Sequence, residues 1–299
     1  MSKKLAGIRK KIDGLDEQVH DLLMQRADLV AGIVDEKRKA GMDVVNPARE
    51  VEVVRRLLGR HKGALPEQAI LSIWRELVGA VCMMQAALKI SVAHDERDEP
   101  ERFRERWDMA KTYFGSVLPV SRAATPLMAV ANVRDGEADF AVLPWPEEGM
   151  DSEEIEPWWS FIYKAERKLH VVCALPYGFE EGQSFGSQEN KAMVVSKGDF
   201  LESGDDESCL ILEIDTTISR ARIVEVLDKL KIKPVSVHTK TRFDGGEKSL
   251  HMVVVEGYFG FEDARLQAIA EGFDVEGTVC VSLGGYPVPP QLKAAKVLA

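Results

Sequence analysis

The first part of the chain carries apolar residues at the spacing of an α-helix. They recur every three or four positions, which places them on one face of a helix. They are Leu5, Ile8, Ile12, Leu15, Val19, Leu22, Leu29 and Ile33. Gly41 supplies a stop signal. We therefore predict one helix from residue 5 to about residue 40, roughly 54 Å long at ~1.5 Å per residue.

Two shorter helices are predicted next. Asn46–Pro47 is a favourable start, because Asn caps a helix and Pro suits its first position. The buried face of this second helix is formed by Val51, Val54, Leu57 and Leu58. A third helix is predicted from about Pro66 to Leu88, with an apolar side formed by Ile70, Trp74, Leu77 and Val81. Within one chain, the two shorter helices cannot cover the whole apolar stripe along the first helix. We therefore expect an intertwined homodimer.

From residue 89 the pattern changes to short apolar runs that are typical of strands. They are KISVA, GEADFAVLPW, LHVVCALP, KAMVVS, CLILEID and SLHMVVVEGYF. An amphipathic helix is predicted at RIVEVLDKLK, and a solvated helix is predicted to start in the charge-rich stretch HDERDEPERFRER. The best linker candidate is SGDDES at 203–208. We predict an all-α module at 1–88, an α/β domain at 89–204, an α+β domain at 205–290 and a loose tail at 291–299.

Composition narrows the class of protein. With 299 residues, 45% hydrophobic and 29% charged, the chain fits a soluble globular protein of about two domains. The four cysteines form no CxxC pair and the six histidines lack metal-ligand spacing, which argues against disulfides and zinc. No run of ~18 apolar residues and no apolar signal core are present. We therefore expect a cytoplasmic protein with no membrane contact, no metal and no cofactor.

Charge is distributed unevenly along the chain. Residues 1–90 carry 16 Lys and Arg against 12 Asp and Glu, whereas the remainder carries 23 against 37. A basic module attached to an acidic remainder could indicate that the protein binds nucleic acid. The basic residues are spread along helices rather than clustered with aromatics, so we expect no nucleic-acid partner. A local site for an anionic small molecule explains the excess equally well.

Each predicted helix places a polar residue on its apolar side. Arg26 and Lys37 continue the stripe of the first helix, 11 residues and about three turns apart, so they share a face. Glu50 lies on the buried side of the second helix, and Gln85 continues the apolar line of the third.

Each of these residues alone has a simple structural explanation. Arg and Lys can extend their charged ends from a helix edge to water, a carboxylate is favourable in a first helical turn, and Gln85 can lie at a rim. The set as a whole is harder to explain, because buried charges cost several kcal/mol unless they are paired. Here the cations outnumber the single carboxylate. The imbalance indicates a missing anionic partner, a ligand with carboxylates that the helices enclose.

Three segments carry a resemblance to a known family. Residue types and spacings over 5–88 resemble the all-helical chorismate mutase module that is fused to prephenate dehydratase in bifunctional P-proteins. The segments are IRKKIDGLDEQVHDLLMQRADLV, NPAREVEVVRRL and IWRELVGAVCMMQ. The resemblance implies that Arg26, together with Arg9 from the other protomer, binds the two carboxylates of chorismate. It also implies that Lys37 contacts a carboxylate and the ether oxygen, and that Gln85 donates a hydrogen bond to that oxygen.

The resemblance assigns the remaining site residues on the second and third helices. Glu50 is expected to accept a hydrogen bond from the ring hydroxyl, and Arg49 is expected to line the site. Asn46 stands where the family often has Asp, and Val81 stands where some members have Ser. The implied catalytic residues are Lys37, Gln85 and Arg26.

The implied reaction is consistent with these residue types. Chorismate rearranges to prephenate by a pericyclic shift that needs no nucleophile, metal or proton transfer. The enzyme must hold a flexible dianion in a compact chair and stabilise the negative charge that grows on the breaking ether oxygen. Fixed cations and a neutral amide donor provide both.

Residues 89–287 resemble, more weakly, the dehydratase region and its ACT regulatory domain, but three dehydratase motifs are replaced. HDERDE stands in place of a GPEGT-like loop, and WPEEG stands in place of an IENS-like segment. Lys191, Ala192 and Met193 occupy the position of the Thr-Arg-Phe signature. We therefore predict that dehydratase activity is absent.

The ACT-like motifs are also altered. Ser219-Arg220-Ala221 replaces a GAL-like turn and Thr239-Lys240-Thr241-Arg242 replaces an ESRP-like segment, which argues against regulation by phenylalanine. Scaffolding, dimer support and docking to another aromatic-pathway enzyme remain as roles for this half. Three alternatives to the monofunctional mutase stay open: a bifunctional mutase–dehydratase, a non-catalytic regulatory protein that keeps a chorismate pocket, and an isochorismate pyruvate-lyase.

Overall fold

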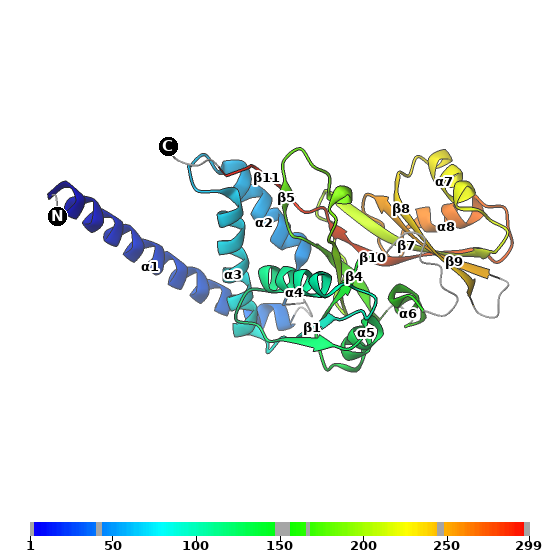
Figure 1. The fold of residues 1–299 in the computed structure, drawn as a ribbon, viewed down its shortest axis with the longest axis horizontal. Coiled ribbons are helices and arrows are strands. Elements are labelled where there is room, and N and C mark those ends of the chain that lie inside the picture. Colours follow the sequence, from blue (N-terminus) through cyan, green and yellow to red (C-terminus); the bar gives the residue numbers. More distant parts are fainter. Residues whose placement is uncertain (1–2, 40–43, 147–155, 166–167, 244–247, 296–299) are drawn as a thin grey trace.

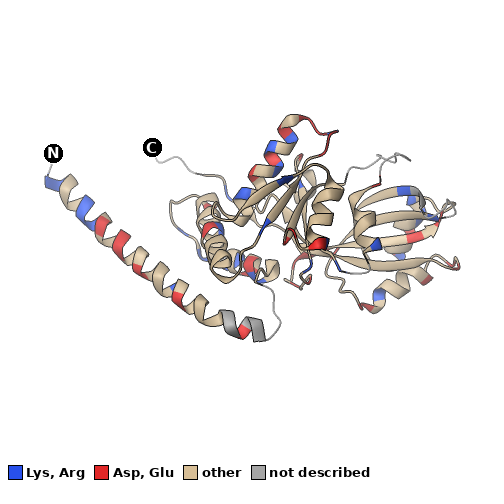
Figure 2. Cartoon of the chain, turned by 90° about the horizontal axis from the view of Figure 1, so that it is seen from below, with Lys and Arg blue, Asp and Glu red and all other residues tan. Residues whose placement is uncertain are grey.

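The three predicted N-terminal helices are present. The computed structural model describes residues 3–39, 44–146, 156–165, 168–243 and 248–295. It contains α1 (Lys3–Lys39), α2 (Pro47–Arg60) and α3 (Glu67–Gln85). In both overall views α1 extends as a long arm away from the rest of the chain (Figure 1, Figure 2). The prediction for the third helix is correct except at its end, which is Gln85 rather than Leu88.

The start of α2 follows from its local sequence. The side chain of Asn46 accepts a hydrogen bond from the Arg49 backbone N–H at 2.9 Å, and Pro47 occupies the first helical position. The cap satisfies one of the donors that a helix start leaves open, and Pro has no such donor to satisfy. The predicted start at Asn46–Pro47 is therefore confirmed.

The remainder of the chain alternates strands and helices around a sheet. The first group is β1 (Ile90–Ala93), α4 (Pro100–Phe114), β2 (Val120–Ala123), α5 (Pro126–Asp135), β3 (Phe140–Pro144), α6 (Trp158–Lys164), β4 (His170–Leu175), β5 (Phe179–Glu180), the 3-10 turn Phe185–Ser187 and β6 (Ala192–Ser196). The second group is β7 (Asp206–Asp215), α7 (Arg220–Lys229), β8 (Pro234–Phe243), β9 (Lys248–Glu256), α8 (Ala264–Glu271), β10 (Val279–Pro287) and β11 (Gln291–Leu292).

Within the described residues, the main sheet has nine strands in the order β2-β1-β3-β6-β4-β10-β7-β9-β8. β1 runs parallel to β2 and β3, and β6 runs antiparallel to β3 and β4. The second group follows a βαββαβ order with antiparallel pairs, an arrangement of the ferredoxin-like kind. After the helical module, the chain therefore forms an α/β unit followed by an α+β unit.

A glycine joins the two groups of strands into one sheet. Gly284 on β10 pairs with Val171 on β4, and its φ is 95°. A Cβ at this position would lie 2.3 Å from the Val171 carbonyl oxygen. Only glycine combines that backbone conformation with so close an approach.

Alternate residues of the strands face two different helical layers. Leu143 and Val195 lie in a core with α5 and α6, whereas their neighbours Val142 and Val194 lie in a core with α4. The second core also contains Val51, Val54 and Leu58 of α2 and Leu71 and Cys82 of α3. The helices α2 and α3 thus share one hydrophobic core with the α/β unit that follows residue 88.

Polar contacts also fasten α2 and α3 to the body. Arg55 on α2 donates to the backbone oxygens of Ser203, Asp205 and Val288 at 2.8–3.1 Å. Glu67 on α3 is buried and accepts from the Lys293 backbone N–H at 2.9 Å. The helical module is therefore attached to segments from far along the chain.

The most deeply buried side of α3 differs from the predicted one. Ile70, Trp74, Leu77 and Val81 are only half-buried. The side that packs on the body carries Leu71, Arg75, Gly79 and Cys82. A Cβ on Gly79 would lie 2.1 Å from the Phe114 carbonyl oxygen, so α3 and α4 cross too closely for a larger residue.

Three further expectations need correction. The predicted linker at 203–208 is shorter, because Asp206 already begins β7 and Ser208 is fully buried. The predicted loose tail begins later, because Gln291–Leu292 pairs with Phe179–Glu180. The charge-rich stretch after β1 is not wholly solvated, since Asp95 and Arg106 are buried. Among the described residues, no helix has the length and apolar character needed to cross a membrane.

Candidate functional site

The apolar stripe of α1 is exposed. Its eight predicted residues have exposed fractions between 42% and 73%, with Leu29 the highest. Water-exposed apolar area of this extent on one helix face is unusual for a soluble protein and marks a contact surface. Within the described residues of one chain, nothing covers this stripe.

The predicted residues of α1 occupy different parts of the helix. Arg26 is half-buried, on the side where Leu23, Ala27 and Val30 are also half-buried, and α1 contacts α3. Arg9 is exposed and lies 17 residues before Arg26, about 26 Å away along the axis. The two arginines of one chain therefore cannot meet at one small ligand. Lys37 lies near the end of α1, and its side chain is outside the described residues.

The end of α3 presents a polar group without a partner. Val81 and Gln85 are both half-buried, and Gln85 is the last residue of the helix. The Oε1 atom of Gln85 is buried and has no hydrogen-bond partner among the described residues. A buried acceptor in this state costs roughly 1–3 kcal/mol, so Gln85 is suited to a partner from outside these residues.

The start of α2 places Arg49 and Glu50 in different environments. Arg49 is exposed and forms an ion pair with Glu52 at 2.8 Å. Glu50 points to the body and forms an ion pair with Arg75 at 2.6 Å, with side-chain exposures of 10% and 3%. The structure therefore groups Asn46, Arg49 and Glu50 along one helical turn but pairs only Glu50 with a buried cation.

Arg75 is the residue that sequence reasoning missed. Its Nε donates to the Tyr113 carbonyl oxygen at 2.5 Å. Its guanidinium carbon lies 3.9 Å from the ring centre of Tyr113 and 4.9 Å from that of Tyr177. Arg75 is therefore held by an anion, a carbonyl and two aromatic rings, which together compensate for its burial. The available signal was its position one turn after Leu71 on the buried side of α3.

The electrostatics of this cluster keep Arg75 charged. Burial alone lowers the pKa of Arg75, but Glu50 and the two tyrosines outweigh it, so the pKa ends above its usual value. Burial raises the pKa of the neighbouring Cys173 thiol to about 12, which leaves it protonated. Both Arg75 and the Tyr113 hydroxyl contact Oε2 of Glu50. Within the described residues, Oε1 of Glu50 accepts no recorded hydrogen bond and can receive one from a ligand.

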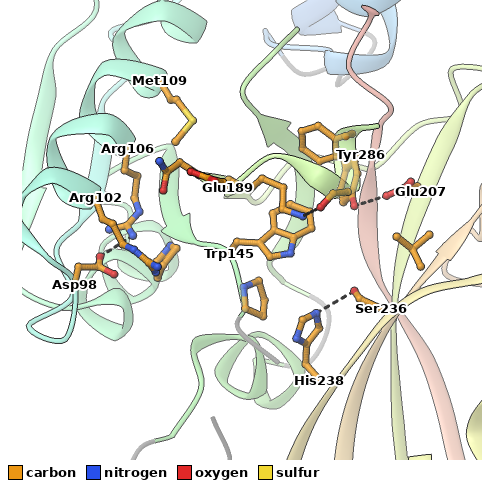
Figure 3. Close-up of a pocket in the computed structure, with 17 residues that line it drawn as sticks. Asp98, Arg102, Arg106, Met109, Trp145, Glu189, Glu207, Ser236, His238 and Tyr286 are labelled. Atoms are coloured by element: carbon orange, nitrogen blue, oxygen red, sulfur yellow. Dashed lines mark hydrogen bonds and ion pairs between the residues drawn. The ribbon is translucent and has the colours of Figure 1, made fainter. Parts of the chain in front are cut away.

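The three segments that replace dehydratase motifs meet at one cavity. The segment after β1 contributes Asp98, the segment after β3 contributes Trp145, and Lys191 directly precedes β6 (Figure 3). The cavity has a volume of about 520 Å³ and also receives His238 and Tyr286 from the α+β unit. These segments are far apart in the sequence, and the sheet brings them to one edge.

The two segments that replace ACT-like motifs also meet. Arg220 at the start of α7 donates from Nε to Thr239 Oγ1 at 2.9 Å. Thr239 Oγ1 lies 3.0 Å from His251 Nδ1. The side chains of Thr241 and Arg242 lie outside the described residues. No group of three or more His, Cys, Asp or Glu able to hold a metal occurs in the described part of the chain.

Comparison with known proteins identifies the helical module. Residues 8–86 match the family model of chorismate mutase type II. Residues 8–86 form a chorismate mutase type II domain. The chain is also 27% identical over 146 residues to a bifunctional chorismate mutase/prephenate dehydratase from Aquifex aeolicus (strain VF5). That similarity spans 48% of this chain and 39% of the relative, so less than half of the relative's length is matched.

The solved structures that match this chain are distant from it. A quorum-quenching acylase named GqqA has a TM-score of 0.46 at 13% identity and covers 67% of this chain and 95% of its own. Prephenate dehydratase from Streptococcus mutans has a TM-score of 0.45 at 12% identity and covers 68% and 99%.

Replacing Arg75 by Leu tests the buried pair. Arg75→Leu leaves the Glu50 carboxylate buried without its cation, so the free energy of unfolding should fall by about 3–5 kcal/mol. The double variant Arg75→Leu/Glu50→Leu removes both charges and should recover much of that loss. Denaturant unfolding of the full chain measures both. A loss below about 1 kcal/mol for the single variant contradicts the burial described here.

Proposed function

We propose that this protein is a chorismate mutase that converts chorismate to prephenate in phenylalanine and tyrosine biosynthesis. The observation that carries the proposal is that the matched family segment, 8–86, contains every candidate site residue from Arg9 to Gln85. The proposal is supported by the half-buried Arg26 on α1, a helix that contacts α3, and by the unpartnered Oε1 of Gln85.

The site works by position and charge. Arg26 and the partner protomer's copy of Arg9 bind the two carboxylates of chorismate, which holds the flexible dianion in its reactive chair. Lys37 and the amide of Gln85 meet the ether oxygen, where negative charge grows as the carbon–oxygen bond breaks. Donors that are fixed before the reaction stabilise this charge without reorganisation, which lowers the barrier.

Glu50 positions the ring of the substrate. Its Oε2 is occupied by Arg75 and Tyr113, which fixes the carboxylate, and its Oε1 is open to accept from the ring hydroxyl. Arg49, Asn46 and Val81 line the site around this contact. Asn46 is engaged as the cap of α2 through its side-chain oxygen.

The active unit is an intertwined homodimer. The exposed stripe of α1 needs a cover, and apolar burial contributes roughly 25 cal/mol per Å² removed from water. A second copy supplies that cover through its own α1 and the half-buried side of its α3. The same arrangement brings Arg9 of one chain to the site of the other.

The second half is a dehydratase-like domain at 89–204 and an ACT-like domain at 205–290 that have lost their motifs. The βαββαβ order supports the ACT-like assignment. We propose roles in scaffolding, dimer support or docking to another aromatic-pathway enzyme, in a reducing cytoplasm. A bifunctional mutase–dehydratase is the alternative, favoured by the similarity to the Aquifex protein.

Replacing Lys37 tests the mutase assignment. Lys37→Ala removes a cation at the ether oxygen and should slow chorismate loss by roughly a hundredfold or more. Lys62→Ala, in the exposed loop after α2, is the matched control and should keep the wild-type rate. Absorbance of chorismate during turnover measures both. If Lys37→Ala consumes chorismate at a rate within a few-fold of wild type, the mutase assignment is wrong.

The same assay separates the other functions. Chorismate binding without turnover by the wild-type protein favours a regulatory protein. Faster conversion of isochorismate than of chorismate favours a pyruvate-lyase.

Prephenate tests the predicted loss of the dehydratase. With the replaced segments at the cavity, purified full-length protein should form no phenylpyruvate from prephenate above an enzyme-free blank. Chromatography of the products measures this. Clear enzyme-dependent formation of phenylpyruvate establishes the bifunctional alternative instead.

A further inference from the structure

A buried polar cluster joins the helices α2 and α3 to the α/β unit. Glu50 lies in the first turn of α2, Arg75 lies in the middle of α3, and Tyr113 lies near the end of α4. The Glu50 side chain is 10% exposed, and Arg75 and Tyr113 are buried. Tyr113 lies outside the matched family segment 8–86. A candidate substrate-binding residue is therefore held by a part of the chain that the family segment does not include.

The backbone of α4 holds Arg75 in place. Arg75 Nε donates to the Tyr113 carbonyl oxygen, and its Nη1 donates to Glu50 Oε2 at 2.6 Å. The chain after α4 is itself fixed against α3, because Glu76 accepts from the Ser116 backbone N–H and from the Ser116 hydroxyl, both at 3.0 Å. A guanidinium is planar, so two hydrogen bonds to different partners determine its orientation. Arg75 therefore presents Nη1 to Glu50 in a direction that α4 determines.

The side chain of Tyr113 adds a second donor to the same carboxylate oxygen. Its hydroxyl donates to Glu50 Oε2 at 3.3 Å, and its ring centre lies 3.9 Å from the Arg75 guanidinium carbon. Two donors on Oε2 restrict the rotation of the carboxylate and so fix the direction of Oε1. A glutamate held in this way loses little further rotamer freedom when a ligand donates to Oε1.

Tyr177 contacts the same cluster in a different way. Its ring centre lies 4.9 Å from the Arg75 guanidinium carbon. Its hydroxyl is buried and has no hydrogen-bond partner among the described residues. Of these two tyrosines, Tyr113 therefore offers Glu50 a hydrogen bond, whereas Tyr177 offers Arg75 a ring face.

We propose that Tyr113 is a positioning residue of the chorismate mutase, through which the α/β unit directs Glu50 Oε1 at the ring hydroxyl of chorismate. The inference rests on the proposed function. It assigns Tyr113 no contact with the substrate and no chemical step. It gives the second half of the chain a part in the mutase reaction, because a residue of α4 determines how well the site recognises the ring hydroxyl.

Tyr113→Phe in the full-length protein tests the positioning role. The variant keeps the ring and the backbone carbonyl that hold Arg75, and it removes only the hydroxyl that is bonded to Glu50. The two substrates are chorismate and an analogue with hydrogen in place of the ring hydroxyl, which keeps the enol ether that rearranges. The kcat/KM for chorismate should fall roughly three- to tenfold, whereas the value for the analogue should change by less than about twofold. Where the analogue turns over too slowly, its inhibition constant against chorismate gives the same comparison.

The ratio of the two values separates positioning from a general structural effect. A loosened fold lowers both values together, whereas loss of Glu50 positioning lowers the chorismate value alone, because the analogue has no hydroxyl to recognise. An unchanged chorismate value, or an equal fall for both substrates, overturns the inference and leaves the mutase assignment standing. Absence of chorismate turnover by the wild-type protein overturns both.

Tyr177→Phe is the matched control. It removes a hydroxyl of the same kind from the same buried cluster, but one without a hydrogen-bond partner in the described part of the chain. This variant should keep the wild-type kcat/KM for both substrates within about twofold. Thermal unfolding and circular dichroism of both variants confirm that they fold. If Tyr177→Phe lowers the preference for chorismate as much as Tyr113→Phe does, the effect does not pass through the hydrogen bond to Glu50, and the inference is wrong.

Discussion

The apolar stripe of α1 is the constraint on which the rest of the account depends. Its residues are 42–73% exposed, and the other helices cannot cover them, because α2 and α3 bury their most apolar sides against the sheet. An exposed apolar stripe of this extent marks a surface for contact with another surface. We propose that a second copy of the chain provides that surface and completes a site whose two arginines are about 26 Å apart on one helix. In the proposed dimer, dimerisation and catalysis depend on the same face.

The buried ion pair between Arg75 and Glu50 links this site to the body. The pair is 2.6 Å long and lies against Tyr113 and Tyr177, which belong to the α/β unit. Glu50 thus takes its orientation from residues outside the matched family segment. Because α2 and α3 also share a hydrophobic core with the sheet, the helical module and the α/β unit form one packed body rather than two independent domains.

The sequence predicts the elements well and their packing less well. Periodicity and the Asn46–Pro47 cap locate the three helices to within a few residues, because those signals are local. Arg75 escaped the sequence analysis because its partners Tyr113 and Tyr177 lie 38 and 102 residues away, and a charged residue in a helix is normally assigned to solvent. The sequence analysis assigned the wrong buried side to α3 for the same reason. The side that is buried carries Arg75 and Gly79, and neither residue is recognised as apolar from its type. The cavity at the ends of β1 and β3 required the strand order, which sequence spacing does not give.

A complementation experiment tests the shared active site most directly. Arg9→Ala and Lys37→Ala chains, coexpressed with two different affinity tags and purified on both, give dimers with one altered chain of each kind. In the intertwined dimer, one site combines the intact Lys37 of one chain with the intact Arg9 of the other, while the second site lacks both. The account predicts about half the wild-type rate of chorismate conversion for this heterodimer, although each variant alone is nearly inactive. A heterodimer no faster than either variant alone would contradict it.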